Sequence, residues 1–138
     1  MNKNDLKPAV VFAEFAKINE IPRPSKREEK MIEYLKSWGE SHNLDTKVDE
    51  TGNVIIRKPA TKGMENRKTV ILQSHMDMVC DKLVDVEFDF DKDAIKTYVD
   101  GEWLTAEGTT LGAKLAILVH HTVYTSVFHR LRIVNVLR

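Results

Sequence analysis

The chain has 138 residues, enough for one domain with a hydrophobic core, and its 42% apolar and 30% charged residues argue against disorder. Basic and acidic residues number 21 each, so the net charge is zero and gives no reason to expect nucleic acid or an acidic membrane surface as a partner. A single cysteine, Cys80, excludes an internal disulfide framework, and with no signal-peptide pattern and no run of about 18 apolar residues the sequence predicts a cytoplasmic protein without a membrane span.

Two helices are expected first. Apolar residues at i, i+3, i+4 and i+7 spacing predict a helix over residues 8–19. Residues 21–24, Ile-Pro-Arg-Pro, cannot remain helical and are expected to form an extended connection. Ser25 and Glu28 have the spacing of a capping box, which predicts that a second helix starts at Ser25 and ends near residues 42–43.

Four short segments are predicted as strands that pair in two hairpins. These segments are 45–50 with 54–57, and 96–99 with 102–105. The second hairpin is expected to turn at Asp100-Gly101, a pair that favours a type I′ turn. The acidic stretch at residues 81–93 lies before it and is expected to be irregular and solvated.

An apolar run at residues 70–72 precedes two residues that suit a metal site. The run predicts a buried strand, central in a mixed or parallel sheet. His75 and Asp77 follow it and share one face of an extended chain, because residues i and i+2 point the same way. A neutral imidazole can ligate a metal through one nitrogen while a carboxylate accepts the proton on the other. A hydrogen-bonded structural histidine is the commoner alternative on spacing alone, since His-x-Asp often occurs by chance.

Residues 114–138 differ from the rest of the chain. They contain four basic residues and no acidic residue, glycine or proline. We therefore expect a boundary between residues 1–113 and a divergent, apolar and basic tail at 114–138. The order of elements before the tail predicts an α/β or α+β domain with a mixed sheet.

The tail has two readings in terms of secondary structure. Val119, Val123 and Val127 recur every four residues, which fits an amphipathic helix whose apolar side extends to Leu131 and Val134. Valine and isoleucine also suit strands, but we favour a helix to about residue 128.

Four stretches carry a family resemblance. They are FAKINEIPRPS at residues 15–25, DETGNVII at 49–56, VILQSHMDMV at 70–79 and DGEWLTAEGTTLGA at 100–113. Together they resemble the amino-terminal part of the Xaa-His dipeptidases, also called aminoacylhistidine dipeptidases, which belong to the zinc-dependent aminoacylases, dipeptidases and carboxypeptidases. The resemblance implies a mixed-sheet α/β fragment of a zinc-peptidase catalytic domain, without the lid or dimerisation domain. It also implies zinc as cofactor and metal-dependent hydrolysis of dipeptide substrates.

The resemblance assigns His75 as a ligand of one metal and Asp77 as the carboxylate that supports it. In the family, Gly-Thr-Thr-Leu-Gly-Ala is followed by an aspartate that bridges two metals, whereas Lys114 follows here. A lysine ammonium has donors only and cannot bridge two cations. The family's paired glutamates, further acidic ligand and distal histidine match no position of this sequence. We therefore expect a truncated chain that binds zinc weakly or not at all and is inactive alone.

Two alternatives to an enzyme fragment stay open. One is a non-catalytic remnant or interaction module that self-associates, because the apolar tail and open sheet edges would lack partners. The other is a single-metal domain that uses His75 with one or two of His120, His121 and His129. For these three histidines ordinary surface or packing roles are favoured, since His120 and His121 point to different faces of a helix or strand.

Overall fold

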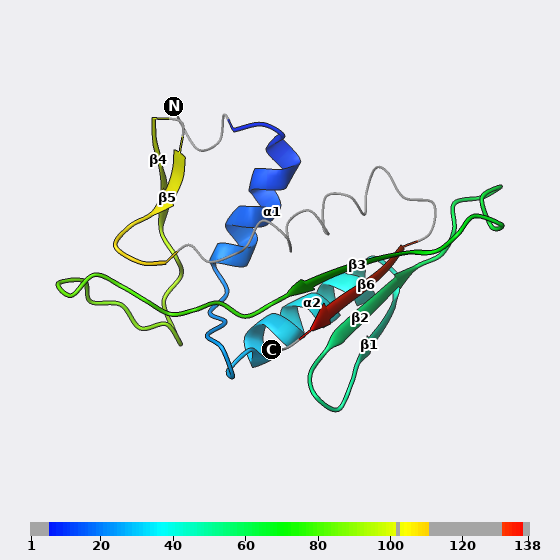
Figure 1. Cartoon of the computed structure of the whole chain (residues 1–138), viewed down its shortest axis with the longest axis horizontal. Coiled ribbons are helices and arrows are strands. Elements are labelled where there is room, and N and C mark those ends of the chain that lie inside the picture. Colours follow the sequence, from blue (N-terminus) through cyan, green and yellow to red (C-terminus); the bar gives the residue numbers. More distant parts are fainter. Residues whose placement is uncertain (1–5, 102, 111–130, 137–138) are drawn as a thin grey trace.

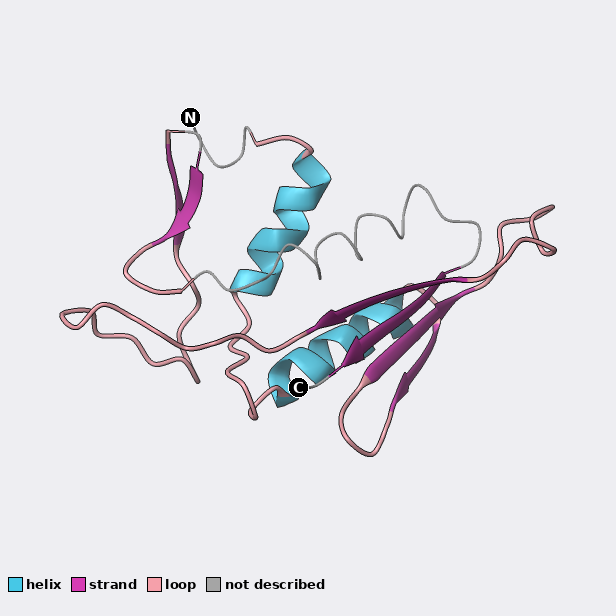
Figure 2. Cartoon of the chain, in the orientation of Figure 1, coloured by secondary structure: helices cyan, strands magenta, loops and turns pink. Residues whose placement is uncertain are grey.

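The computed structural model describes residues 6–101, 103–110 and 131–136, the last range as backbone only (Figure 1). The helices are α1 (Ala9–Asn19) and α2 (Glu29–Ser41), and the strands are β1 (Asp45–Val48), β2 (Val54–Lys58), β3 (Val70–His75), β4 (Thr97–Asp100), β5 (Trp103–Ala106) and β6 (Leu131–Val136). In this part of the chain the strands form a sheet of order β1-β2-β6-β3 and a separate hairpin, β4-β5. Figure 2 shows α2 lying along one face of the larger sheet, where it packs on β1 and β2.

The larger sheet is mixed, as the sequence predicted. β6 runs antiparallel to β2 and parallel to β3. β1 and β2 form the expected antiparallel hairpin, with Thr46 opposite Ile56. The predicted fold class, an α/β arrangement with a mixed sheet, is therefore confirmed.

The core lies between α2 and the larger sheet. Met31 and Leu35 project from α2 onto Val54 and Ile56 of β2, and all four side chains are almost completely buried. Removing such apolar surface from water is the main force that holds a helix on a sheet. The cluster is completed by Ile18, Leu44 and Met76.

A glycine sets how closely α2 approaches β1. A Cβ at Gly39 would lie 2.1 Å from the Oγ1 of Thr46, far inside any normal contact. The helix can therefore approach the strand this closely only because residue 39 has no side chain.

The start of α2 differs from its prediction. The helix begins at Glu29, and Glu28 occupies the N-cap position without a side-chain capping bond. The Glu28 carboxylate instead accepts a hydrogen bond from the Lys26 amide, and Ser25 bonds to Asp77. Lys26 has a φ of +71°, which no α-helical residue adopts, so the capping box at Ser25 is wrong.

The predicted central strand lies at one end of the sheet. Within the described residues β3 pairs only with β6, and Ile71 is 58% exposed while Ser74 is buried. The expectation of a buried central strand is therefore wrong. Although residues 70–72 are all apolar, the side chains of this strand alternate between its two faces, and Ile71 points away from the face on which the core lies.

β6 corrects part of the prediction for the tail. The favoured helix ends at about residue 128, but its apolar pattern was extended to Leu131 and Val134, and that extension is wrong because residues 131–136 form a strand between β2 and β3. The expected helix at residues 114–128 lies outside the described residues. In the described residues the outer edges of β1 and β3 have no strand partner. The boundary at residue 113 stays a prediction.

The second hairpin forms one residue later than expected. Asp100 pairs with Trp103, so Asp100 belongs to the strand pair and is not a loop position as predicted. Gly101 has a φ of +57°, the left-handed conformation that a tight hairpin turn needs.

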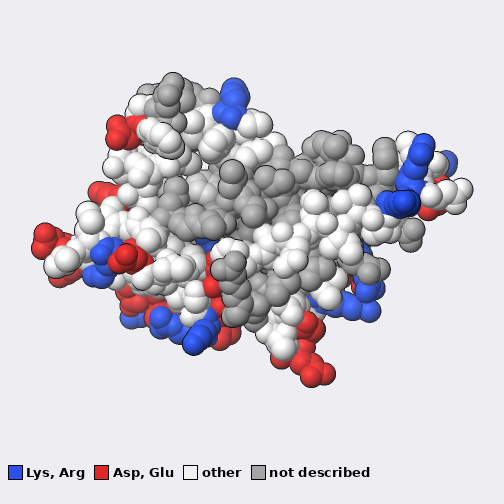
Figure 3. Space-filling view, viewed as in Figure 1, with Lys and Arg blue, Asp and Glu red and all other residues white. Residues whose placement is uncertain are grey.

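The segment before this hairpin is irregular, as predicted. Residues 81–93 contain turns and one isolated bridge, between Lys82 and Thr109. On the face shown in Figure 3, the acidic and basic side chains of the described residues lie mixed, in keeping with the balanced net charge. No helix in the described part of the chain is long and apolar enough to cross a membrane.

Asp49 organises the turn of the first hairpin. Its Oδ1 accepts hydrogen bonds from the amides of Thr51 and Asn53 and from the Thr51 hydroxyl, and its Oδ2 accepts one from the Asn53 side chain. These bonds, that of the Asn53 side chain foremost, lower the pKa of Asp49 to about 2. A carboxyl group whose pKa is lowered in the folded state stabilises the fold at pH values above its ordinary pKa of 3.8. This stabilisation is lost as the pH falls toward 2.

We predict that Asp49→Asn flattens the acid side of the stability profile. The variant is expected to be less stable than the wild type at pH 7 and to lose less stability between about pH 4 and pH 2, because the titrating group is gone. Urea unfolding at a series of pH values measures both effects. Glu50→Gln, a change at the adjacent exposed carboxylate, is the matched control. Parallel pH profiles for the wild type and Asp49→Asn would contradict this account of the turn.

Candidate functional site

His75 and Asp77 meet where β3 ends. His75 is the last residue of the strand, and its Nδ1 lies 2.8 Å from Oδ1 of Asp77. The side chains are 28% and 10% exposed, so the pair borders solvent without being immersed in it. The prediction that the two side chains lie on the same side of the chain is confirmed.

The second oxygen of Asp77 is also engaged. The Ser25 hydroxyl donates to Oδ2 at 2.6 Å. Burial works to raise the pKa of Asp77, but the hydrogen bonds from Ser25 and His75 and the charge of His75 lower it below its ordinary value. Asp77 is therefore ionised at neutral pH and accepts hydrogen bonds through both oxygens.

A short parallel contact holds the loop that carries Asp77. The amide of Met78 donates to the carbonyl of Arg23 at 3.0 Å, and the amide of Ser25 donates to the carbonyl of Met78 at 3.2 Å. Pro24 and Met78 thereby form a parallel bridge. Met76 and Met78 are buried on either side of Asp77, which fixes its backbone. The extended connection predicted for residues 21–24 is thus the partner of the site loop.

Arg23 lies beneath this contact and is only 1% exposed. One terminal nitrogen of its guanidinium donates to the carbonyls of Ile18 and Ile21, whereas Nε and the other terminal nitrogen have no partner among the described residues. Burial lowers the pKa of Arg23 to about 10, and the charges of Asp77 and Cys80 oppose that shift. A guanidinium with this pKa keeps its charge at neutral pH, so a buried positive charge lies next to the contact that holds the loop of Asp77.

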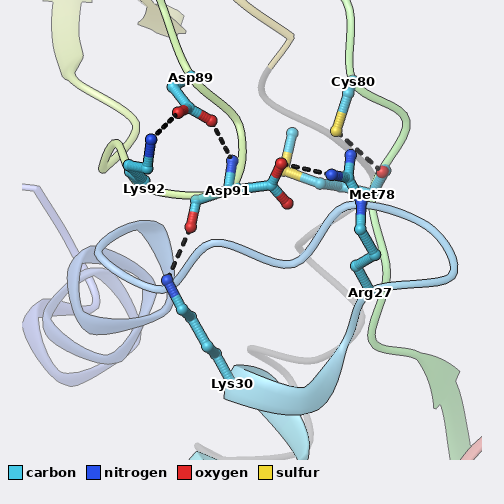
Figure 4. A network of polar contacts seen from close by, with 7 residues as sticks. All are labelled: Arg27, Lys30, Met78, Cys80, Asp89, Asp91 and Lys92. Carbon is cyan, nitrogen blue, oxygen red and sulfur yellow. Dashed lines mark hydrogen bonds and ion pairs between the residues drawn. The ribbon is translucent and has the colours of Figure 1, made fainter.

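Salt bridges fasten the acidic segment beside the site. Figure 4 shows Arg27 paired with the Asp91 carboxylate and Lys30 donating to the Asp91 carbonyl at 2.7 Å. Asp89 binds Lys92 at 2.9 Å and accepts from the Asp91 amide at 3.0 Å. These contacts join the segment to the start of α2 and leave the His75–Asp77 pair untouched.

Cys80 lies in the same loop but belongs to no group of three potential metal ligands among the described residues. Its thiol contacts the carbonyl of Met78 at 3.7 Å (Figure 4), and the residue is partly buried.

The pair offers one metal ligand. With Nδ1 directed at Asp77, the Nε2 of His75 has no hydrogen-bond partner among the described residues. This arrangement of carboxylate, imidazole and open nitrogen is the one that orients histidine ligands of zinc. The described residues contain no group of three His, Cys, Asp or Glu that could hold a metal ion. Lys114 and the three tail histidines lie outside the described residues.

Two residues of this site were missed from the sequence. Ser25 was assigned to a helix cap, and Arg23 was treated only as part of a helix-breaking segment. The usable signal was an arginine between two prolines in a stretch that resembles the dipeptidases.

Comparison with known proteins confirms the resemblance to dipeptidases. No family model matches the chain. The cytosol non-specific dipeptidase of Escherichia coli (strain K12) is 51% identical over 110 residues, which is 80% of this chain and 23% of that protein. The chain therefore spans about a quarter of the length of this curated relative.

Solved structures agree on the fold. The aminoacylhistidine dipeptidase from Vibrio alginolyticus matches all of this chain with a TM-score of 0.93 and 41% identity, over 29% of its own length. A tripeptidase from Staphylococcus aureus and the aminopeptidase PepT from Bacillus cereus match 92% of the chain with TM-scores of 0.66 and 0.69. Their identities of 19% and 20% make them evidence for the fold alone. The mixed sheet is thus part of a peptidase fold.

Proposed function

We propose that this chain carries the His75–Asp77 half of a zinc site for dipeptide hydrolysis. The observation that carries the proposal is the 2.8 Å contact between Nδ1 of His75 and Asp77, which leaves Nε2 to bind a metal. The names of the two more similar relatives, a non-specific dipeptidase and an aminoacylhistidine dipeptidase, support dipeptides, including Xaa-His dipeptides, as the substrate class.

Each residue has a separate task in this proposal. His75 would hold the metal, and Asp77 would keep the imidazole in the tautomer whose Nε2 lone pair faces outward. When bound, zinc supplies Lewis-acid activation of water and of a peptide carbonyl. Lys114 stands where the resemblance places the bridging carboxylate, so residues 1–113 carry the family pattern and 114–138 depart from it. The single cysteine and the cytosolic relative favour a cytoplasmic location.

Zinc titration by calorimetry tests the assignment of His75. Stable catalytic zinc sites use three protein ligands, so one histidine with a supporting carboxylate is expected to bind zinc only weakly, with a Kd of about 1 μM or higher. His75→Ala is expected to abolish this binding. His42→Ala, which removes an exposed imidazole from the end of α2, is the matched control and should leave it unchanged. Equal binding by the wild type and His75→Ala would refute the assignment, and a sub-micromolar site lost in His75→Ala would instead favour the single-metal alternative.

Exposed apolar side chains favour a second role, as a self-associating module. Val79, Leu83 and Val84 are 73%, 66% and 97% exposed in one irregular segment, and Trp103 is 77% exposed on β5. Such surface promotes association, as do the outer edges of β1 and β3, which have no strand partner among the described residues.

We predict that the chain self-associates at tens of micromolar, an order of magnitude at which such surfaces usually associate. Light scattering should show a mass that rises with concentration, and replacing Leu83 and Val84 together by serine should reduce the rise. A monomer at these concentrations, with cooperative thermal unfolding and no binding of an apolar dye, would exclude this role.

A further inference from the structure

Ser25 reaches the site from far away in the sequence. Its hydroxyl lies 2.6 Å from Oδ2 of Asp77 and 3.2 Å from the carbonyl of Met78. Its amide donates to the same Met78 carbonyl, so the backbone on both sides of the contact is paired. The position of the hydroxyl is therefore set by the fold and not by a mobile side chain alone.

The hydroxyl has one proton to donate. The contact with Asp77 is the shorter one, and Asp77 carries a full negative charge, whereas Met78 offers a neutral carbonyl. The Ser25 hydroxyl therefore donates its hydrogen bond to Asp77. The Asp77 carboxylate is then held at both ends, by Ser25 on Oδ2 and by His75 on Oδ1. Rotation of the carboxylate would break at least one of these bonds.

We propose that Ser25 is a positioning residue that fixes the tautomer of His75 through Asp77. A carboxylate whose Oδ1 is held toward Nδ1 of His75 favours the proton on Nδ1 and leaves Nε2 as the nitrogen without a proton. The claim that Nε2 binds a metal rests on the proposed function, whereas the claim that Nδ1 carries the proton does not. The inference and the zinc assignment therefore fail separately.

The test reads the two imidazole nitrogens of His75 in the metal-free full chain. Long-range proton–nitrogen NMR spectra of histidine-labelled protein at about pH 8.5, where an ordinary imidazole is neutral, distinguish the two tautomers. The wild type is expected to show the proton on Nδ1. An Nε2-protonated His75 in the wild type would overturn the proposal without any variant.

Three substitutions isolate the hydroxyl. Ser25→Ala and Ser25→Val remove it, while Ser25→Thr keeps it in a side chain of the same shape as valine. Loss of a hydrogen bond to a charged group should lower the ratio of Nδ1-protonated to Nε2-protonated His75 by about fivefold or more in the Ala and Val variants. The Thr variant should behave as the wild type. Ser37→Ala, on the exposed face of α2, is the control for loss of a serine hydroxyl elsewhere.

Zinc binding gives a second readout. Ser25 acts on the metal ligand His75 only through Asp77, so its effect on metal affinity should lie at the low end of the range for outer residues of metal sites. We therefore expect Ser25→Ala and Ser25→Val to weaken zinc binding about tenfold, and Ser25→Thr to leave it unchanged. If Ser25→Ala does not fold, the Thr and Val pair decides, because the two differ only in the hydroxyl. An unchanged His75 tautomer in a folded Ser25→Ala or Ser25→Val protein would overturn the proposal. Zinc binding that survives His75→Ala would instead refute the proposed function and leave the tautomer result standing.

Discussion

The purified 138-residue chain is expected to hydrolyse no Xaa-His dipeptide faster than the metal ion alone, whether zinc, manganese or cobalt is supplied. The reason is that the sequence lacks two groups that the family resemblance implies for hydrolysis. Lys114 stands where a bridging carboxylate is implied, and no position of the sequence matches the glutamate pair that would supply a general base. A positioned general base alone contributes about 10²–10⁴-fold in rate, and the metal adds further orders of magnitude.

A dipeptide assay with product detection by chromatography measures this directly. Lys114→Asp is the informative comparison, since it restores a carboxylate at the implied bridging position and is expected to strengthen zinc binding without producing turnover. Hydrolysis by the unmodified chain that disappears in His75→Ala would overturn the prediction, because it would show that His75 works in a site complete within these residues.

Arg23→Ala is expected to lower the free energy of unfolding by about 3–5 kcal/mol, a large part of the stability of a domain this size. The change removes a buried side chain, takes the guanidinium hydrogen bonds away from the Ile18 and Ile21 carbonyls and takes a positive charge away from Asp77. All three losses weaken the connection at residues 21–24, which holds the loop that carries Asp77.

Denaturant unfolding of three variants separates these contributions. Arg23→Met fills the volume without the charge and should cost less than Arg23→Ala, because apolar replacements of buried ions are often tolerated. Arg27→Ala removes an exposed arginine paired with Asp91 and should cost no more than about 1 kcal/mol. An Arg23→Ala protein as stable as Arg27→Ala would show that the buried guanidinium contributes little to holding the connection.

Local patterns in the sequence predicted the elements that depend on local interactions. The helix at 9–19 followed from the spacing of its apolar residues, and the hairpin of β1 and β2 followed from two short strand-forming segments close together in the sequence. The contact between His75 and Asp77 followed from the two-residue period of an extended chain. These features need few residues, close together in sequence.

The errors arose where distant residues decide the structure. Ser25 fits a capping box locally, but the pairing of residues 23–25 with Met78 draws its side chain to Asp77. The apolar run of β3 suggested burial on both faces, yet the strand ends the described sheet and exposes Ile71. The segment of β6 contains β-branched residues at spacings that suit either helix or strand, and pairing with β2 and β3 decided it.

In the proposed site, His75 presents Nε2 to a metal while Asp77 holds Nδ1. An anomalous difference map at the zinc edge, from a crystal of the chain soaked in zinc, tests it most directly. We expect a peak about 2.0–2.1 Å from Nε2 of His75, the usual zinc–nitrogen distance, with the 2.8 Å contact from Nδ1 to Asp77 preserved. A peak on Nδ1, a peak on Asp77 with the histidine turned away, or zinc bound only at other residues would contradict it.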